Sequence, residues 1–152
     1  MAPLSAAAHP EIIEAVVDSG AEDSVAPPGL FPGEVLPSLM SREGRRYRAA
    51  NGSPIPNLGQ TLAHFWDADG AVCGIPFQVA QVERPLISVS RMAAAGCRVS
   101  FEGDTGEIPH VSSGRRLPLV RRSGVYVLEL RVIPASGTGR RPQPAGPFPR
   151  QG

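Results

Sequence analysis

Lysine is absent from this chain, and aromatic residues are scarce. All 15 basic residues are arginine, so these side chains carry a planar guanidinium group rather than the compact ammonium group of lysine. Because aromatic residues make up only 5% of the sequence, we expect valine, leucine, isoleucine and alanine to fill the core. The net charge of +1 is too small to indicate by itself a protein that binds nucleic acid.

Long apolar runs are missing as well. No run approaches the roughly 18 residues that a transmembrane helix requires. The N-terminus also lacks the basic flank and the apolar segment of a secretory signal. These absences predict a cytoplasmic protein that does not interact with a membrane.

Cysteine and histidine are too few and too widely spaced for a disulfide scaffold or a metal site. Cys73 and Cys97 are the only cysteines, and we expect both to be reduced and buried. His9, His64 and His110 lie far apart, and no pair has the spacing of metal ligands. We therefore expect neither a metal nor another cofactor.

Length and composition predict one small all-β domain. A chain of 152 residues can bury one core and not two. Its 17 prolines and 17 glycines interrupt it too often for long helices and favour short strands joined by turns. We expect a disordered leader over residues 1–10, the folded domain over 11–133, and a disordered tail rich in Pro, Gly and Arg over 134–152.

The pattern of β-branched and turn residues predicts the secondary structure within this domain. One short helix is expected over residues 90–95, capped by Ser88 or Ser90 and ended by Gly96. The pair Asn51-Gly52 predicts a hairpin with a two-residue type I′ turn. Strands are expected near residues 11–17, 46–50, 54–66, 71–82, 97–101, 106–111, 116–121 and 124–132.

The segment Val-Val-Asp-Ser-Gly-Ala at residues 16–21 carries most of the functional information. β-branched residues predict a strand up to Val17, and Gly20 allows a sharp turn directly after it. In such a turn, backbone N–H groups can hold the Asp18 carboxylate rigidly while its outer oxygen faces a cleft. An ordinary Asx-turn explains the same few residues, because Asp-Ser-Gly is common turn chemistry.

The surrounding sequence resembles the retropepsins, and in particular the proteases of Copia-type retrotransposons. Residues 18–25 (Asp-Ser-Gly-Ala-Glu-Asp-Ser-Val) are similar to the segment that carries the catalytic aspartate in that family. Residues 48–59, 84–101 and 124–130 then resemble later family segments in the correct order. The resemblance covers about residues 14–130, and each segment alone is a weak signal.

This resemblance implies a small closed barrel and an aspartic endopeptidase that works as a homodimer on the junctions of its own polyprotein. Water would be activated between two Asp18 side chains, one from each subunit, and the activity would require dimerisation and an intact N-terminal strand. The hairpin around Asn51 would close over the peptide. The implied catalytic residues are Asp18, Ser19 and Gly20, and the implied substrate-binding residues are Ala21, Glu22, Asp23, Asn51 and Gly52.

A second Asp-Thr-Gly begins at Asp104, so two lobes within one chain have to be considered. Glu102 and Gly103 separate it from the preceding apolar residues, and Glu107 stands where an alanine is expected. We therefore predict a tight turn between two strands at Asp104. A chain this short also lacks the length for two complete lobes.

Two other functions are compatible with the sequence. A retroelement-derived barrel without proteolytic activity would be a binding or structural module, and a scaffold segment of a longer polyprotein is a further alternative. The binding module would use two groups of arginines for nucleic acid, although balancing acidic residues also make these arginines compatible with solvated strand ends. These arginines are Arg42, Arg45, Arg46, Arg48, Arg115, Arg116, Arg121 and Arg122.

Overall fold

The computed structural model of the chain describes residues 11–49 and 51–134. The predicted leader and all of the predicted tail except Pro134 lie outside the described residues. The strands are β1 (Glu11–Asp18), β2 (Val25–Ala26), β3 (Arg46–Arg48), β4 (Pro54–Pro56), β5 (Gly59–Trp66), β6 (Val72–Val79), β7 (Leu86–Ser88), β8 (Ser100–Glu102), β9 (Thr105–Pro109), β10 (Arg116–Arg122) and β11 (Val125–Val132), and the helices are α2 (Leu39–Arg42) and α3 (Val89–Ala94). The predicted mostly-β fold is confirmed.

The helix expected near residues 90–95 is confirmed as α3, and Ser88 is its N-cap. The prediction of a single helix is wrong, because α2 forms a second one. Ser38 and Ser41 exchange hydrogen bonds across the first turn of α2 in a capping box. A helix of four residues is too short to show a helical period, so hydrophobic periodicity could not predict it.

The expected strand over residues 54–66 is divided in two. Asn57 interrupts it, because its side-chain oxygen accepts the Gly59 N–H at 2.8 Å and closes a local turn. Gly59 has a φ of +135°, and a Cβ added there would meet the Leu36 carbonyl oxygen at 2.6 Å. The chain therefore changes direction between β4 and β5, and β4 pairs with β3 in a hairpin of its own.

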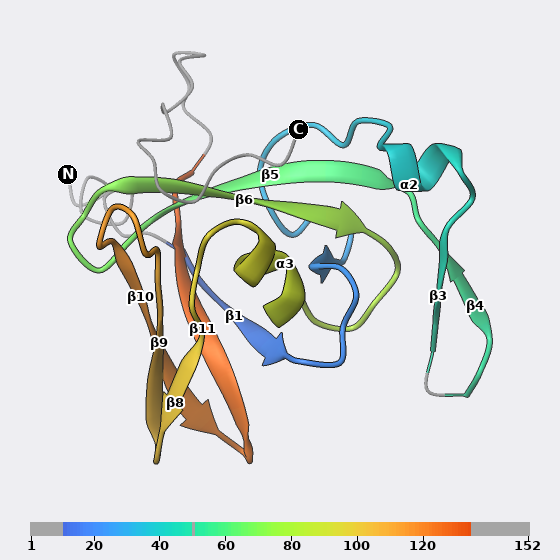
Figure 1. Ribbon diagram of the computed structural model, residues 1–152. Helices are drawn as coiled ribbons and strands as arrows, with labels where there is room; N and C mark the ends of the chain where they lie inside the picture. Colours follow the sequence, from blue (N-terminus) through green and yellow to red (C-terminus); the bar gives the residue numbers. More distant parts are fainter. Residues whose placement is uncertain (1–10, 50, 135–152) are drawn as a thin grey trace, which may run out of the picture.

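Nine strands form the main sheet, in which β11 has the most partners, namely β1, β5 and β10 (Figure 1). β1 runs antiparallel to β11 and, at its C-terminal end, parallel to β7. The two-residue strand β2 lies between β6 and β7. The long hairpin of β5 and β6 pairs with β11 through β5. Strands β2 and β7 were not predicted, because strands this short show no alternating pattern of their own.

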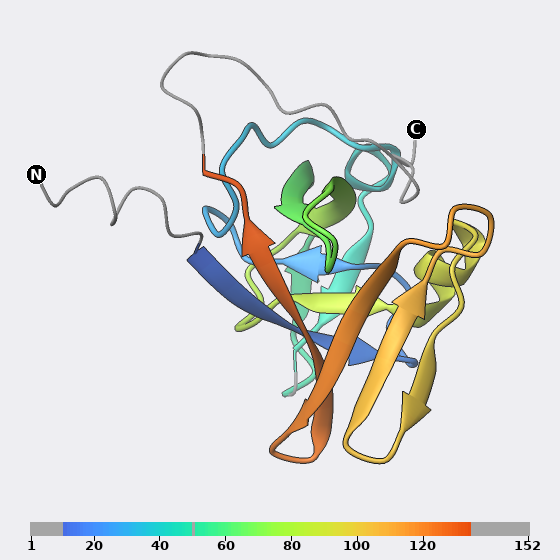
Figure 2. The same ribbon diagram turned by 90° about the vertical axis from the view of Figure 1, so that its left-hand side faces the viewer.

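Strands β8 to β11 form an antiparallel arm in sequence order, visible in Figure 2 in yellow to orange. The predicted turn at Asp104 is confirmed, because it connects β8 and β9 as a hairpin. Gly106 lies where the two strands are closest, and a Cβ there would meet the Ser100 carbonyl oxygen at 2.4 Å. This second Asp-Thr-Gly therefore lies at the tip of a hairpin and not at the end of a buried strand.

The core joins all of the long strands into one cluster of buried side chains. Aliphatic residues of β1, β10 and β11 supply much of it, as expected. Phenylalanine contributes more than the composition suggests, since Phe31, Phe65 and Phe77 are all buried. The rings of Phe31 and Phe77 lie 4.9 Å apart between centroids. Cys73 and Cys97 are free and buried, which confirms the prediction for both thiols.

Candidate active site

Asp18 is the last residue of β1, opposite Ser88 in the parallel pairing with β7. Its side chain is half-buried, and the backbone N–H of Gly20 donates to its Oδ1 at 2.8 Å. This bond between residues two positions apart is that of an Asx-turn, and it fixes one of the two carboxylate oxygens. Ser19 and Gly20 are exposed in this turn, and Ala21 is half-buried.

Ser88 fixes the loop that follows Asp18. Its fully buried hydroxyl donates to the Ala21 carbonyl oxygen at 2.8 Å, and its backbone N–H donates to the Ser24 hydroxyl at 3.0 Å. The same hydroxyl accepts the Arg91 N–H at 3.1 Å as the N-cap of α3. One side chain thus joins the loop to the start of α3. The sequence indicated only the cap, because the contact with Ala21 spans 67 positions.

Asp23 is the most highly connected carboxylate near Asp18. Its side chain is 1% exposed, and its Oδ1 accepts from Nη2 and Nε of Arg91 at 2.7 and 3.1 Å. Its Oδ2 accepts from the Tyr47 hydroxyl at 2.9 Å, and Arg45 lies 3.8 Å away. Burial and the adjacent Asp23 carboxylate raise the pKa of Tyr47, so Tyr47 keeps its proton and remains a donor.

Glu22 occupies a different environment from Asp23. Its side chain is 81% exposed, and its carboxylate pairs with Arg45 at 3.0 Å. Its backbone carbonyl oxygen accepts from Nε of Arg91 at 3.2 Å. Contact of Glu22 and Asp23 with a substrate backbone stays a prediction. The buried Asp23 already has partners at both carboxylate oxygens, whereas the exposed Glu22 is accessible from solvent.

Asn51 and Gly52 lie in the connection between β3 and β4, and both are exposed. The predicted two-residue turn of type I′ is wrong: β3 ends at Arg48 and β4 begins at Pro54, so the connection is longer. Gly52 has a φ of +87°. The Asn51 side chain accepts from Ser53 N–H and hydroxyl.

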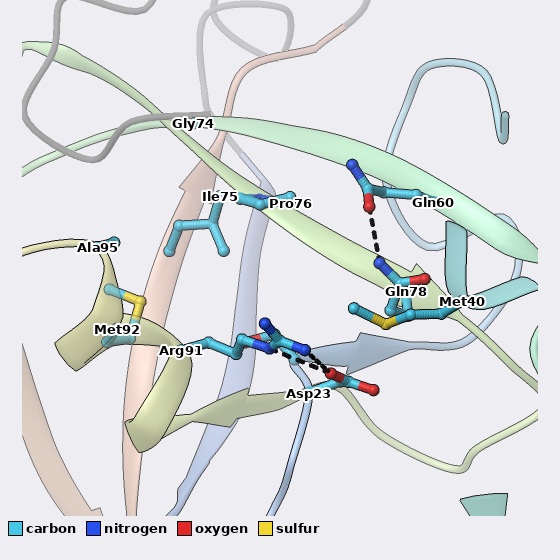
Figure 3. A pocket seen from close by; sticks show the side chains of 11 residues that line it. Asp23, Met40, Gln60, Gly74, Ile75, Pro76, Gln78, Arg91, Met92 and Ala95 are labelled. Atoms are coloured by element: carbon cyan, nitrogen blue, oxygen red, sulfur yellow. Dashed lines mark hydrogen bonds and ion pairs between the residues drawn. The ribbon is translucent and has the colours of Figure 1, made fainter. Parts of the chain in front are cut away.

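A small pocket lies beside this loop and is partly open to solvent. Met40, Ile75 and Met92 form much of its apolar wall, and Arg91 and Asp23 form a polar end (Figure 3). The loop that follows Asp18 therefore forms one wall of the pocket.

Within residues 11–49 and 51–134, no group of histidine, cysteine and carboxylate side chains could hold a metal ion. In the same part of the chain, no helix is long and apolar enough to cross a membrane. Comparison with family models, with curated proteins and with solved structures finds no match for this chain.

Proposed function

We propose that the chain is a retropepsin-like aspartic endopeptidase of retroelement origin, active as a homodimer. The observation that carries the proposal is the position of Asp18. It ends β1, and β1 runs parallel to its neighbour on one side. The turn holds one carboxylate oxygen through the Gly20 N–H, and Ser88 holds the loop that follows. A catalytic carboxylate needs this kind of fixed and accessible position.

The strand pairings support the small barrel that the proposal requires. From β1 they run through β7, β2, β6, β5 and β11, and the pairing of β11 with β1 completes the circuit. We propose that these six strands form the barrel and that β8 to β10 extend from it.

In the proposed reaction, Asp18 of each subunit meets its symmetry mate across a two-fold interface. Two carboxylates about 3 Å apart cannot both ionise without a large penalty, so the pair shares one proton. The ionised member takes a proton from water, which attacks the carbonyl carbon of the peptide. The protonated member donates a hydrogen bond to the carbonyl oxygen and stabilises its developing charge. The substrates would be junctions of the retroelement polyprotein.

A binding module without catalysis is the second candidate, and the exposure of two arginines on the β3–β4 hairpin supports it. Arg46 and Arg48 are both exposed on β3 and, two positions apart, project to the same side of the strand. Such a pair could contact phosphate groups. Replacement of Asp18 distinguishes the two candidates, because nucleic-acid binding would not require this carboxylate.

We expect Asp18→Asn to reduce peptide cleavage by at least about 1,000-fold, because the proton-sharing pair is lost. The measurement is cleavage of a peptide library by the full chain at mildly acidic pH, with and without pepstatin. Asp104→Asn is the matched control, because Asp104 begins the second Asp-Thr-Gly but lies in an exposed turn. Cleavage that persists in Asp18→Asn would exclude the proposed mechanism.

A further inference from the structure

The β3–β4 hairpin is connected to the rest of the chain mainly at its base. Among its described residues (46–49 and 51–56), only Tyr47 makes a hydrogen bond to a residue outside 46–57. This bond runs from the Tyr47 hydroxyl to Oδ2 of Asp23 at 2.9 Å. Its acceptor belongs to the loop that follows Asp18. Apart from the ion pairs that Arg45, at the base of the hairpin, makes with Glu22 and Asp23, the Tyr47 hydroxyl is therefore the polar link between the described hairpin residues and that loop.

The acceptor of this bond is itself immobile. The Asp23 side chain is 1% exposed, and two nitrogens of Arg91 hold its other oxygen. Arg91 belongs to α3, whose first turn is capped by Ser88. Loss of the Tyr47 donor would leave one oxygen of a buried carboxylate without its strongest partner, which is unfavourable.

The Tyr47 hydroxyl is also connected to the sheet. It accepts a hydrogen bond from the Asn57 side-chain amide at 3.2 Å. That amide also donates to Oε1 of Gln78 on β6 at 2.9 Å, and Ser38 donates to the same oxygen at 2.8 Å. A continuous set of hydrogen bonds thus runs from α3 through Tyr47 to β6 and α2. Ion pairing of Arg45 with the exposed Glu22 adds little, because solvent screens it.

We infer that Tyr47 is a positioning residue whose hydroxyl clamps the β3–β4 hairpin to Asp23, and that the hairpin opens by breaking this bond. If the proposed function is correct, the clamp keeps the hairpin oriented for closure over a bound peptide. Its loss would then weaken substrate binding more than it slows the chemical step, because Tyr47 does not contact the reacting atoms.

Hydrogen–deuterium exchange tests the clamp through Tyr47→Phe, which removes the hydroxyl and keeps the ring. We expect amide exchange over residues 45–49 and 51–57 to become about tenfold faster, with little change elsewhere. Tyr126→Phe is the matched control, because Tyr126 is the only other tyrosine and its hydroxyl donates to the Gly103 carbonyl oxygen in the β8–β9 turn. This control should leave exchange in the hairpin unchanged. Unchanged exchange in Tyr47→Phe, or acceleration spread over the whole chain, would overturn the inference.

A double substitution, compared with both single variants, tests the pairing directly. Asp23→Asn removes the charge of the acceptor, and its effect on hairpin exchange should not add to that of Tyr47→Phe. Additive effects would show that the two side chains act independently and would contradict the clamp.

Kinetics separate failure of the clamp from failure of the proposed function. In a cleaving protein, Tyr47→Phe should raise KM about threefold to tenfold and change kcat less than twofold. If the unmodified chain cleaves no peptide but the hairpin exchanges faster in Tyr47→Phe, the clamp is supported and the proposed function fails. If the chain cleaves peptides but hairpin exchange does not change in Tyr47→Phe, the clamp is refuted and the proposed function is retained.

Discussion

At the scale of single residues, buried charges in this chain are satisfied by local backbone groups and by arginine. Asp67 is 1% exposed, and its Oδ1 accepts the N–H groups of Asp69 and Ala71 at 2.8 and 2.9 Å. Arg115 pairs with its other oxygen at 3.3 Å. Burial first, and then the Asp67 carboxylate, raise the pKa of Cys73 to about 12. Both effects disfavour a thiolate at this position.

The two buried thiols predict a loss of stability at alkaline pH. Burial also raises the pKa of Cys97 to about 11, from an ordinary value of 9.0. Above pH 9 the unfolded chain loses thiol protons that the folded chain retains, so the free energy of unfolding falls as pH rises toward 11. Well below pH 9 these thiols should cause little pH dependence, because they are protonated in both the folded and the unfolded chain.

Urea unfolding between pH 8 and pH 11 measures this effect. The reference is a variant in which Cys73 and Cys97 are both replaced by alanine, and only the slope against pH is compared. We expect the unmodified chain to lose stability more steeply than this variant. Equal slopes would contradict the assignment of the effect to the thiols.

At the scale of elements, short strands and one capped helix position the candidate site. β7 places Ser88 opposite Asp18, and α3 starts immediately after Ser88. Arg91 in α3 then reaches back to Asp23. The loop after Asp18 is thus fixed by a strand and a helix that are remote in sequence, and its stability depends on their junction.

Ser88→Ala should lower the free energy of unfolding by about 1–2 kcal/mol, because it removes both the N-cap of α3 and the bond to Ala21. Urea denaturation measures the change. Ser90→Ala is the control, because Ser90 is exposed and, within residues 11–49 and 51–134, its hydroxyl forms a hydrogen bond only with that of Ser88. The control should change stability by less than about 0.5 kcal/mol. Equal losses in the two variants would refute the role given to the junction.

At the scale of the whole molecule, the proposed chemistry needs a second copy of the chain. The one Asp-Thr-Gly of the sequence begins at Asp104, at the tip of the arm, in the β8–β9 turn. An active dyad would therefore have to come from two copies of Asp18. This requirement couples catalysis to association, which can be measured apart from peptide binding.

We expect the cleavage rate per chain to rise with chain concentration and then to reach a plateau as the dimer saturates. Sedimentation velocity over the same concentrations should show dimers appearing together with activity. Asp18→Asn should abolish cleavage while still associating. A constant rate per chain from a protein that sediments as a monomer would refute the homodimer.

The sequence by itself determined most of the long strands, the helix α3 and some of the local turns of this protein. Patterns within a few residues predict the alternating burial along β5, and they predict the strands β10 and β11. Patterns of the same length predict α3 and the turn at Asp104. The Gly20 bond to Asp18 is also local, spanning two positions. Short stretches of sequence contain this information, because interactions between residues that are close in sequence produce these strands and turns.

Only the tertiary structure decided which distant groups meet around Asp18. The short strands β2 and β7 exist because longer strands pair with them, and the bonds of Asp23 to Tyr47 and Arg91 span 24 and 68 positions. A hydroxyl or a guanidinium shows nothing in sequence about its partner, since many acceptors are available to it. Burial selects among these acceptors, because a polar group taken out of water has to be paired in the folded chain.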